Sequence, residues 1–325
     1  MPIRLLLFTL LFTSLAGTCV RAQQFAQYSM PGRDVVQFNP AYAGLDNSLS
    51  ITGAYRSQWA GLDGQPTGQR LSAHLPVYFL SSGFGVEAER DELGARSLNR
   101  FGLSYNYQLV RGASVWSVGL SARMLQLSLD GNRLRTPGGI YEDGAAVIHN
   151  DDLLPSGTVN NSSVALGAGL YYQSEGLEGG LSARNLNAAT VAFPGFDYVL
   201  RREYHAFLRL KLDLLRTWEV FPLAYAVSDG TQHQVQLGAN FRYRENVFVG
   251  AAYRGYSDVT SDAVILTGGL NINDKLTLAY AYDVTLSALR SEVSGSHEIS
   301  INYNLRQRIG AGVPPPIIFY PRTKE

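Results

Sequence analysis

The chain has 325 residues, of which 46% are hydrophobic and only 17% are charged. Its 27 basic and 27 acidic residues balance, so no net field attracts nucleic acid, and a nucleic-acid partner is not expected. Beyond the N-terminal leader no segment approaches twenty apolar residues, which excludes membrane-spanning helices. The 33 glycines and 19 tyrosines instead suit twisted strands with aromatic residues at two membrane interfaces.

Residues 1–22 have the pattern of a secretory signal peptide. Arg4 precedes an apolar run from Leu5 to Phe12, and small residues lead to a predicted cleavage site after Ala22. The only cysteine, Cys19, lies inside this signal. Lipidation of Cys19 is the alternative, but the residue before it, Thr18, is a poor one for a lipoprotein site. The mature chain is therefore expected to have no disulfide and no thiol chemistry.

Residues 23–48 show no periodic pattern and contain Pro31, Gly32, Pro40 and Gly44. Two placements are open for this segment. It is either a plug folded into the lumen of a barrel or a periplasmic arm.

From about Leu49 to Leu305 the chain alternates apolar and polar residues in stretches of about ten. The clearest stretch puts Tyr204, Ala206, Leu208, Leu210, Leu212 and Leu214 on one face, and His205, Phe207, Arg209, Lys211 and Asp213 on the other. A tilted strand of about ten residues rises roughly 25 Å, the height of the apolar band of outer-membrane barrels. The pattern predicts an all-β fold, a transmembrane antiparallel β-barrel over residues 49–305, and indicates that Leu210 faces lipid near mid-span.

The strands are expected near residues 49–60, 69–77, 82–92, 97–109, 114–129, 160–173, 177–186, 202–214, 217–228, 232–244, 246–257, 262–273, 275–286 and 295–305. This is about fourteen strands, an even number as in single-chain bacterial barrels. Short connections, such as 78–81 and 174–176, alternate with generally longer ones, such as 130–159 and 187–201. Short connections are expected in the periplasm and long ones at the cell surface, which puts both termini in the periplasm.

The C-terminal residues 306–325 form a Pro-rich tail. Pro314, Pro315, Pro316 and Pro321 block a strand ladder and favour an extended arm outside the barrel, in the periplasm. A disordered tail and a docking arm for a partner are both consistent with this composition.

Candidate catalytic and metal sites are weak. His74, His149, His205, His233 and His297 have no metal-ligand spacing. Gly119–Arg123 and Gly180–Arg184 repeat the string GLSAR, but a nucleophile elbow requires a second glycine two residues after the serine. Both copies are interpreted as barrel strands with inward Ser and Arg. No enzyme activity, cofactor or metal is expected, although a catalytic triad assembled from separate strands is not excluded by sequence.

Charged residues suggest two further features. Glu142, Asp143, Asp151 and Asp152 lie in the 130–160 loop, which is interpreted as a solvated acidic loop, with calcium binding as the alternative. Inward charges are predicted at Arg123, Arg184, Arg209, Lys211, Asp213, Arg242, Arg244 and Asp283. They either line an aqueous channel or pair within a filled lumen, and the filled lumen is favoured.

Specific strings lie around the start of the barrel. Gln27 and Tyr28 are followed by Phe38, Asn39, Pro40, Ala41, Tyr42, Ala43 and Gly44, then by Arg56, Gln58, Trp59, Gly61, Gly64 and Pro66. Together with the last strand, Ser296–Tyr303, these residues resemble the PorP/SprF family of outer-membrane proteins of the Bacteroidetes type IX secretion system. The resemblance covers about residues 23–305. The Pro-rich tail departs from it, because many members end near the last strand.

The physical properties of these strings suit a fixed bend followed by a constrained loop. Pro40 pushes Asn39 to an extended conformation and Gly44 permits a tight turn, while Trp59 has the character of an interface aromatic. These residues either serve folding, as a plug motif and a girdle tryptophan, or contact cargo and machinery directly.

The resemblance implies a non-enzymatic role with type IX secretion components in the outer-membrane lipid. Members receive or anchor secreted proteins through the cargo's C-terminal domain, in some species adhesins for gliding motility. A passive channel or a transporter of hydrophobic substrates is the alternative function, followed by an enzyme.

Overall fold

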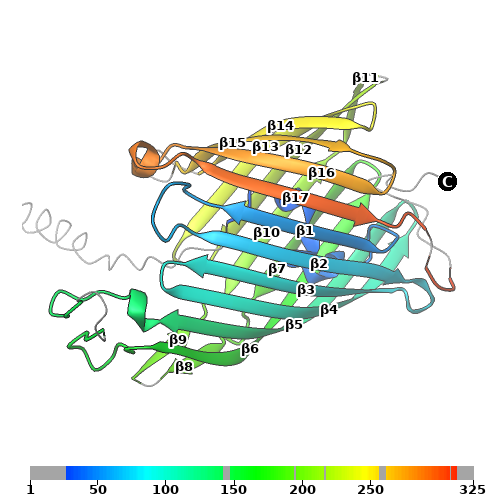
Figure 1. The fold of residues 1–325 in the computed structure, drawn as a ribbon. Coiled ribbons are helices and arrows are strands. Elements are labelled where there is room, and N and C mark those ends of the chain that lie inside the picture. The colour runs from blue at the N-terminus through cyan, green and yellow to red at the C-terminus, as the bar shows by residue number, and fades with distance from the viewer. Residues whose placement is uncertain are drawn as a thin grey trace, which may run out of the picture.

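The computed structural model describes residues 27–141, 147–193, 195–215, 217–255, 261–307 and 309–312. Its main body is a closed antiparallel β-barrel (Figure 1). The signal peptide and most of the Pro-rich tail lie outside the described residues. Among the described residues there is no helix both long and apolar enough to cross a membrane.

The barrel closes because the first strand, β1, pairs with the last, β17, so that Ser50 opposes Asn304 and Ser57 opposes His297. The sheet contains fifteen strands, but β10 and β11 are consecutive pieces of one strand interrupted at Lys211, so fourteen strands form the wall. The strands of the wall are β1 (Ser50–Ser57), β2 (Thr67–Val77), β3 (Ser82–Leu93), β4 (Arg96–Arg111), β5 (Ser114–Asp130), β6 (Thr158–Ser174), β7 (Leu177–Arg184), β10 (Glu203–Leu210) with β11 (Leu212–Leu215), β12 (Trp218–Ser228), β13 (His233–Tyr243), β14 (Val247–Arg254), β15 (Ala263–Asn271), β16 (Leu276–Thr285) and β17 (Ser296–Asn304). The predicted fold class is confirmed.

Apolar side chains face outward along these strands. On β5 the exposed set includes Trp116, Val118, Leu120 and Met124, and the intervening residues are buried. Aromatic pairs such as Trp116–Tyr172 lie next to the short turns, with ring centroids 4.6 Å apart. An apolar exterior with aromatic residues at its border fits a lipid bilayer.

The two ends of the barrel differ. One end, here called the short-turn end, has tight connections such as 112–113 and 175–176. The other, the long-loop end, carries residues 131–157 with the 3-10 helix η5 (Gly131–Arg133), residues 185–202, and residues 286–295 with η7 (Ala288–Ser291). Figure 1 shows η5 and η7 at the same end.

Within the 185–202 loop lies a small hairpin, β8 (Thr190–Phe193) paired with β9 (Phe196–Val199). Val191 and Phe193 pack with the inward side chains Leu98, Leu125 and Leu127. The hairpin therefore folds over the inner face of β4 and β5 and does not continue the wall.

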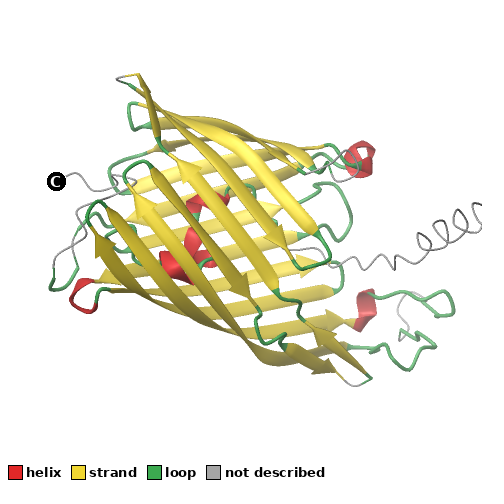
Figure 2. Cartoon of the chain, turned by 180° about the vertical axis from the view of Figure 1, so that it is seen from behind, coloured by secondary structure: helices red, strands yellow, loops and turns green. Residues whose placement is uncertain are grey.

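The chain before β1 lies inside the barrel. Residues 28–48, here called the lumen segment, contain the short helices η1 (Pro31–Arg33), η2 (Val35–Gln37) and η3 (Pro40–Tyr42). In Figure 2 these short helices lie between the front and back walls. Val35, Val36, Phe38, Ala41, Ala43 and Leu45 form a buried cluster with Val115, Tyr171, Phe207 and Leu223 of the wall. The core of this molecule is thus the contact between the lumen segment and the wall.

The direction of the lumen segment contradicts the predicted placement of the chain before β1 and the chain after β17 at the same end of the barrel. Gln58, just beyond the long-loop end of β1, donates to Gln27, whereas Ser48 at the other end of the segment donates to the backbone of Gln307. The segment therefore runs from the long-loop end down to the short-turn end, where β1 begins. The alternation of apolar and polar residues predicted the strands, but it contains no information about the route of the chain before β1.

Two predicted inward charges are also wrong. Arg244 lies in the turn after β13 with φ of 47° and is exposed, and Asp213 on β11 is exposed. Arg244 comes directly after the last residue of β13, and Asp213 lies on β11 beyond the interruption at Lys211, where the pairing with β12 shifts register. By contrast, Arg123, Arg209, Arg242 and Asp283 are buried within the barrel, as predicted.

Candidate functional site

The occupied lumen is the candidate functional site, and the string Phe38–Gly44 lies at its centre. Asn39 precedes η3 and its Oδ1 accepts a hydrogen bond from the Ala41 N–H at 3.0 Å. Its Nδ2 donates to the carbonyls of Leu170 on β6 (3.0 Å) and Leu181 on β7 (3.3 Å). One side chain thus caps the short helix and attaches it to two wall strands.

The carbonyl groups of this string are also bound by the wall. Nδ2 of Asn106, on β4, donates to the carbonyls of Ala41 (2.9 Å) and Ala43 (2.6 Å). Gly44 has φ of 78°, and its N–H donates to Nδ1 of His74 at 3.1 Å. A positive φ favours glycine, so the predicted tight turn at Gly44 is present in the structure.

Aromatic contacts fix the two large side chains of the string. Phe38 lies 5.1 Å from Tyr225 and 5.7 Å from His205, measured between ring centroids. Tyr42 meets Tyr171 edge to face at 5.1 Å and donates its hydroxyl to Asp46 at 2.8 Å. Such ring pairs add about 0.5–1.5 kcal/mol each beyond their burial, so the string is held by packing as well as by hydrogen bonds.

Glycines of the wall leave the space that this string occupies. A Cβ at Gly83 would lie 2.0 Å from the Ala43 carbonyl oxygen, and one at Gly119 would lie 2.4 Å from the Ala41 nitrogen. At Gly169 it would meet the Asn39 side chain at 2.1 Å. These residues were missed by sequence reasoning. The signal that identifies them is glycine at inward positions of several neighbouring strands.

Buried charges hold the N-terminal half of the segment. Arg56 of β1 donates to Oγ of Ser29 and forms an ion pair with Asp283 of β16 at 2.8 Å. Arg254 of β14 reaches the same carboxylate at 2.8 Å, and all three charged side chains are at most 3% exposed. Ser29 also donates to Asp283 at 2.5 Å. The start of the lumen segment is therefore inserted into an ion-pair network that joins three strands.

A second charged contact lies one turn further along the segment. Asp34 accepts a hydrogen bond from Ser72 at 2.8 Å and lies 3.4 Å from Arg70. Arg70 also donates to Gln37 and covers the ring of Tyr28 at 3.9 Å. Arg70 thus contacts the segment at three points.

The other predicted site residues, from Arg56 to Pro66, lie at the end of β1 and in the loop between β1 and β2. The Gln58 N–H donates to the Pro66 carbonyl at 2.9 Å, and Gly61 N–H donates to the Gln65 side chain at 3.0 Å. Trp59 has φ of 55°, and its N–H donates to Ser296. Gly64 accepts a hydrogen bond from Gly94 in the neighbouring turn. Arg56 and Gln58 therefore contact the N-terminal part of the chain inside the barrel, while Trp59, Gly61, Gly64 and Pro66 shape the loop.

The GLSAR copies lie on the strands as predicted. Ser121 and Arg123 of the first copy and Ser182 of the second are buried and face inward. Arg123 donates to the carbonyl of Gln37 at 2.9 Å, and Ser182 donates to the carbonyl of Phe38 at 2.6 Å. Both copies bind the lumen segment. No cluster of three or more potential metal-ligating side chains occurs in the described part of the chain.

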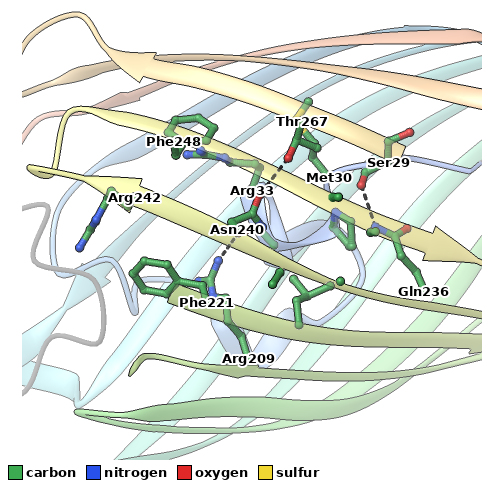
Figure 3. A pocket seen from close by; sticks show the side chains of 17 residues that line it. Ser29, Met30, Arg33, Arg209, Phe221, Gln236, Asn240, Arg242, Phe248 and Thr267 are labelled. Carbon is green, nitrogen blue, oxygen red and sulfur yellow. Dashed lines mark hydrogen bonds between the residues drawn. The ribbon is translucent and has the colours of Figure 1, made fainter. Parts of the chain in front are cut away.

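A small cavity lies beside the lumen segment. Figure 3 shows a cavity between η1 and strands β12–β15, where Gln236 donates to the Ser29 carbonyl at 2.9 Å and Thr267 donates to Asn240 at 3.0 Å. Arg33 covers the ring of Phe248 at 3.7 Å. The cavity volume is about 50 Å³, enough for a few water molecules. A dissolved nutrient would not fit there without movement of the segment.

Comparison with known proteins identifies a matching protein family. Residues 20–303 match the model of the family described as type IX secretion system membrane protein PorP/SprF. No curated protein matches the chain.

Three of the solved structures that resemble this chain have TM-scores below 0.5. The CymD monoaromatic hydrocarbon channel has a TM-score of 0.48 at 14% identity and covers 88% of this chain and 95% of its own. The Pseudomonas putida toluene transporter TodX has a TM-score of 0.45 at 11% identity, with 83% and 92% covered. The Acinetobacter baumannii protein Omp33 has a TM-score of 0.44 at 9% identity, with 81% and 100% covered. At sequence identities this low, the functions of these proteins are not transferred to this chain.

Proposed function

Because the chain belongs to the PorP/SprF family of type IX secretion system membrane proteins, we propose that it is a non-catalytic partner that receives or anchors a secreted cargo protein at the cell surface. The contact would be made by the cargo's C-terminal domain and by other secretion components. The barrel itself lies in the outer membrane, as its closed wall and family indicate.

The observation that carries this proposal is the occupied lumen. The lumen segment is bound to the wall from Ser29 to Gly44 and to Gln307, just after β17, at Ser48, and the cavity beside η1 has room for only a few waters. A barrel filled in this way is suited to present a surface and poorly suited to conduct solutes.

The long-loop end supplies such a surface. In the 131–157 loop Ile140 and Ile148 exchange two backbone hydrogen bonds, and their side chains are 50% and 48% exposed. Leu153, 56% exposed, lies beside Gly195 of the 185–202 loop. Exposed apolar side chains on a braced loop are typical of protein-binding surfaces.

The test is to shorten the 131–157 loop while β5 and β6 are kept intact, and to measure cargo on the cell surface. The cargo is defined as the surface protein that is lost when this chain is deleted. Loop shortening should release that cargo and leave small-solute uptake unchanged. If the cargo stays attached while uptake of a nutrient falls, the chain is a channel.

Matched point variants separate surface chemistry from loop length. Ile140→Asp with Ile148→Asp should lower surface cargo by about tenfold, because apolar anchors dominate protein interfaces. The control is Phe79→Asp with Leu80→Asp, which makes the same change on two exposed residues of the short-turn end. Equal losses in both variants would contradict a binding surface at the long loops.

A further inference from the structure

The wall has one incomplete seam, between β6 and β7. The ladder between the two strands runs only from Ala168 to Gln173 of β6, although β6 begins at Thr158. One further backbone hydrogen bond follows it, from the Leu186 N–H to the Leu166 carbonyl at 2.9 Å. On its other edge β6 pairs with β5 along its whole length, to Thr158 opposite Asp130. The half of β6 toward the long-loop end therefore has a partner on one edge only.

The reason for this seam lies in the chain that follows β7. Asn185 and Ala188 have φ of 54° and 47°, which turns the chain out of the wall. Ala189 and Val191 then pack with inward residues such as Ala165 and Leu125. Among the described residues no strand ladder joins β8 to β6, and the hydrogen bond between them comes from a side chain, since Nδ2 of Asn161 donates to the Ala192 carbonyl at 2.6 Å.

Side-chain amides take the place of a neighbouring strand along the seam. The Leu166 N–H donates to Oδ1 of Asn187 at 3.1 Å, and Nδ2 of Asn187 donates to the Val164 carbonyl at 2.8 Å. Two residues further along, the Ser162 N–H donates to the side chain of its own neighbour, Asn161, at 2.8 Å. Asn187 thus imitates one peptide group of a missing strand.

The remaining edge is suited to an extended peptide. In an antiparallel ladder the N–H and C=O of one residue point to the same side, so Asn160, Ser162, Val164 and Leu166 all direct theirs to the seam. At Leu166 the carbonyl is already bound by the Leu186 N–H, and a new strand would take over only the N–H that Asn187 holds. Their spacing of two residues, about 7 Å, equals the hydrogen-bonding repeat of a strand. Val164 is 54% exposed, and Asn160 and Ser162 are exposed polar residues beyond it. The edge therefore continues past the apolar band toward the surface loops.

We propose that the β6 edge from Asn160 to Leu166 binds an extended segment of a secreted partner protein, which adds to the wall as a strand and displaces the Asn187 side chain. This inference rests on the proposed function and specifies the contact by which cargo is held. Strand addition supplies affinity from main-chain hydrogen bonds, and it explains why the edge is capped by exchangeable side-chain amides.

The first test removes a single edge donor. Ser162→Pro eliminates an N–H that faces the seam and leaves the ladder with β5 intact, so the barrel should assemble, as resistance of the native barrel to SDS at room temperature would show. Surface cargo should fall about five- to tenfold, because the variant loses roughly one backbone hydrogen bond to the cargo and distorts the adjacent one. The matched control Ser162→Thr keeps the N–H and should retain cargo.

An engineered disulfide across the seam tests the same inference even if the proline variant does not assemble. Val164→Cys with Asn187→Cys ties the seam closed, and the predicted mature chain contains no other cysteine. Oxidation should release cargo and a reductant should restore it. The control pair, Ala168→Cys with Ala183→Cys, joins residues that already oppose each other in the ladder and should have no effect.

The outcomes separate this inference from the proposed function. If loop shortening releases cargo but an assembled Ser162→Pro barrel and the locked seam both retain it, the edge inference is overturned and the proposed function stands. If none of these changes releases cargo, both are overturned. If the edge variants change only self-association of the chain on native gels, the edge joins two copies and the inference is likewise overturned.

Discussion

Two adjacent residues of β10 test which interactions stabilise this barrel. The sequence pattern indicated that Leu210 faces lipid near mid-span, where an arginine costs about 2–4 kcal/mol, more than removal of Arg209. In the structure Leu210 opposes Leu177, the first residue of β7, at the short-turn end. An arginine at position 210 can extend to water there, so Leu210→Arg should cost only about 0–1 kcal/mol.

Arg209 has the larger expected effect. It is 8% exposed, is paired with Glu178 of β7, and donates to the carbonyl of Gly32 in the lumen segment at 2.9 Å. Arg209→Leu leaves the Glu178 carboxylate buried without this partner, a change that costs about 3–5 kcal/mol. The expected order of the two substitutions is therefore the reverse of the order that alternation alone predicts.

Urea titrations of the barrel folded into lipid vesicles measure both free energies of unfolding. Leu120→Arg is the mid-span control, because Leu120 is 63% exposed and lies six residues from the start of β5; about 2–4 kcal/mol is expected. Adding Glu178→Gln to Arg209→Leu should recover part of the loss, since it removes the buried charge. A larger cost for Leu210→Arg than for Arg209→Leu would refute this reasoning.

Three further experiments test the lumen segment. Asn39→Ala removes the cap of η3 and two contacts with the wall, so it should lower stability by about 2–3 kcal/mol in the same titration. Gly83→Ala should expel the segment, detected as new trypsin cleavage after Arg33, the one tryptic site within residues 28–48, whereas Gly157→Ala, which meets no atom within 4 Å, should not. Epitope tags at Gln27 and at position 140 should label on intact cells, while a tag at position 175 should not; no labelling at Gln27 would contradict the route of the segment.

The strands could be predicted from sequence because alternation is a local property. The stretch 114–129 was predicted and β5 spans 114–130, since every second residue from Trp116 to Met124 is apolar and faces outward. The same rule failed at Arg244, because alternation continued one residue into a turn of positive φ. The backbone conformation of the turn determines where a strand ends, and the alternation of apolar and polar residues does not predict that conformation.

The candidate site was only partly predictable. The string around Asn39 was identified, but its contacts are with Leu170 and Leu181, more than 130 residues away. A choice between the lumen and a periplasmic arm depends on space left by glycines such as Gly83 and Gly119 on different strands. That space exists only after the barrel closes, so no local pattern reveals it.

The opposite directions of the lumen segment and β1 give the molecule a mechanical polarity. A pull from the cell surface at Gln27 would load the contacts of Ser29, then Asp34, then Asn39, and break them one after another. A pull from the periplasm at Ser48 would load the last contacts of the segment together with β1 along its axis, where ladder bonds with β2 and β17 share the force. The barrel would therefore unplug under outward tension and resist inward tension.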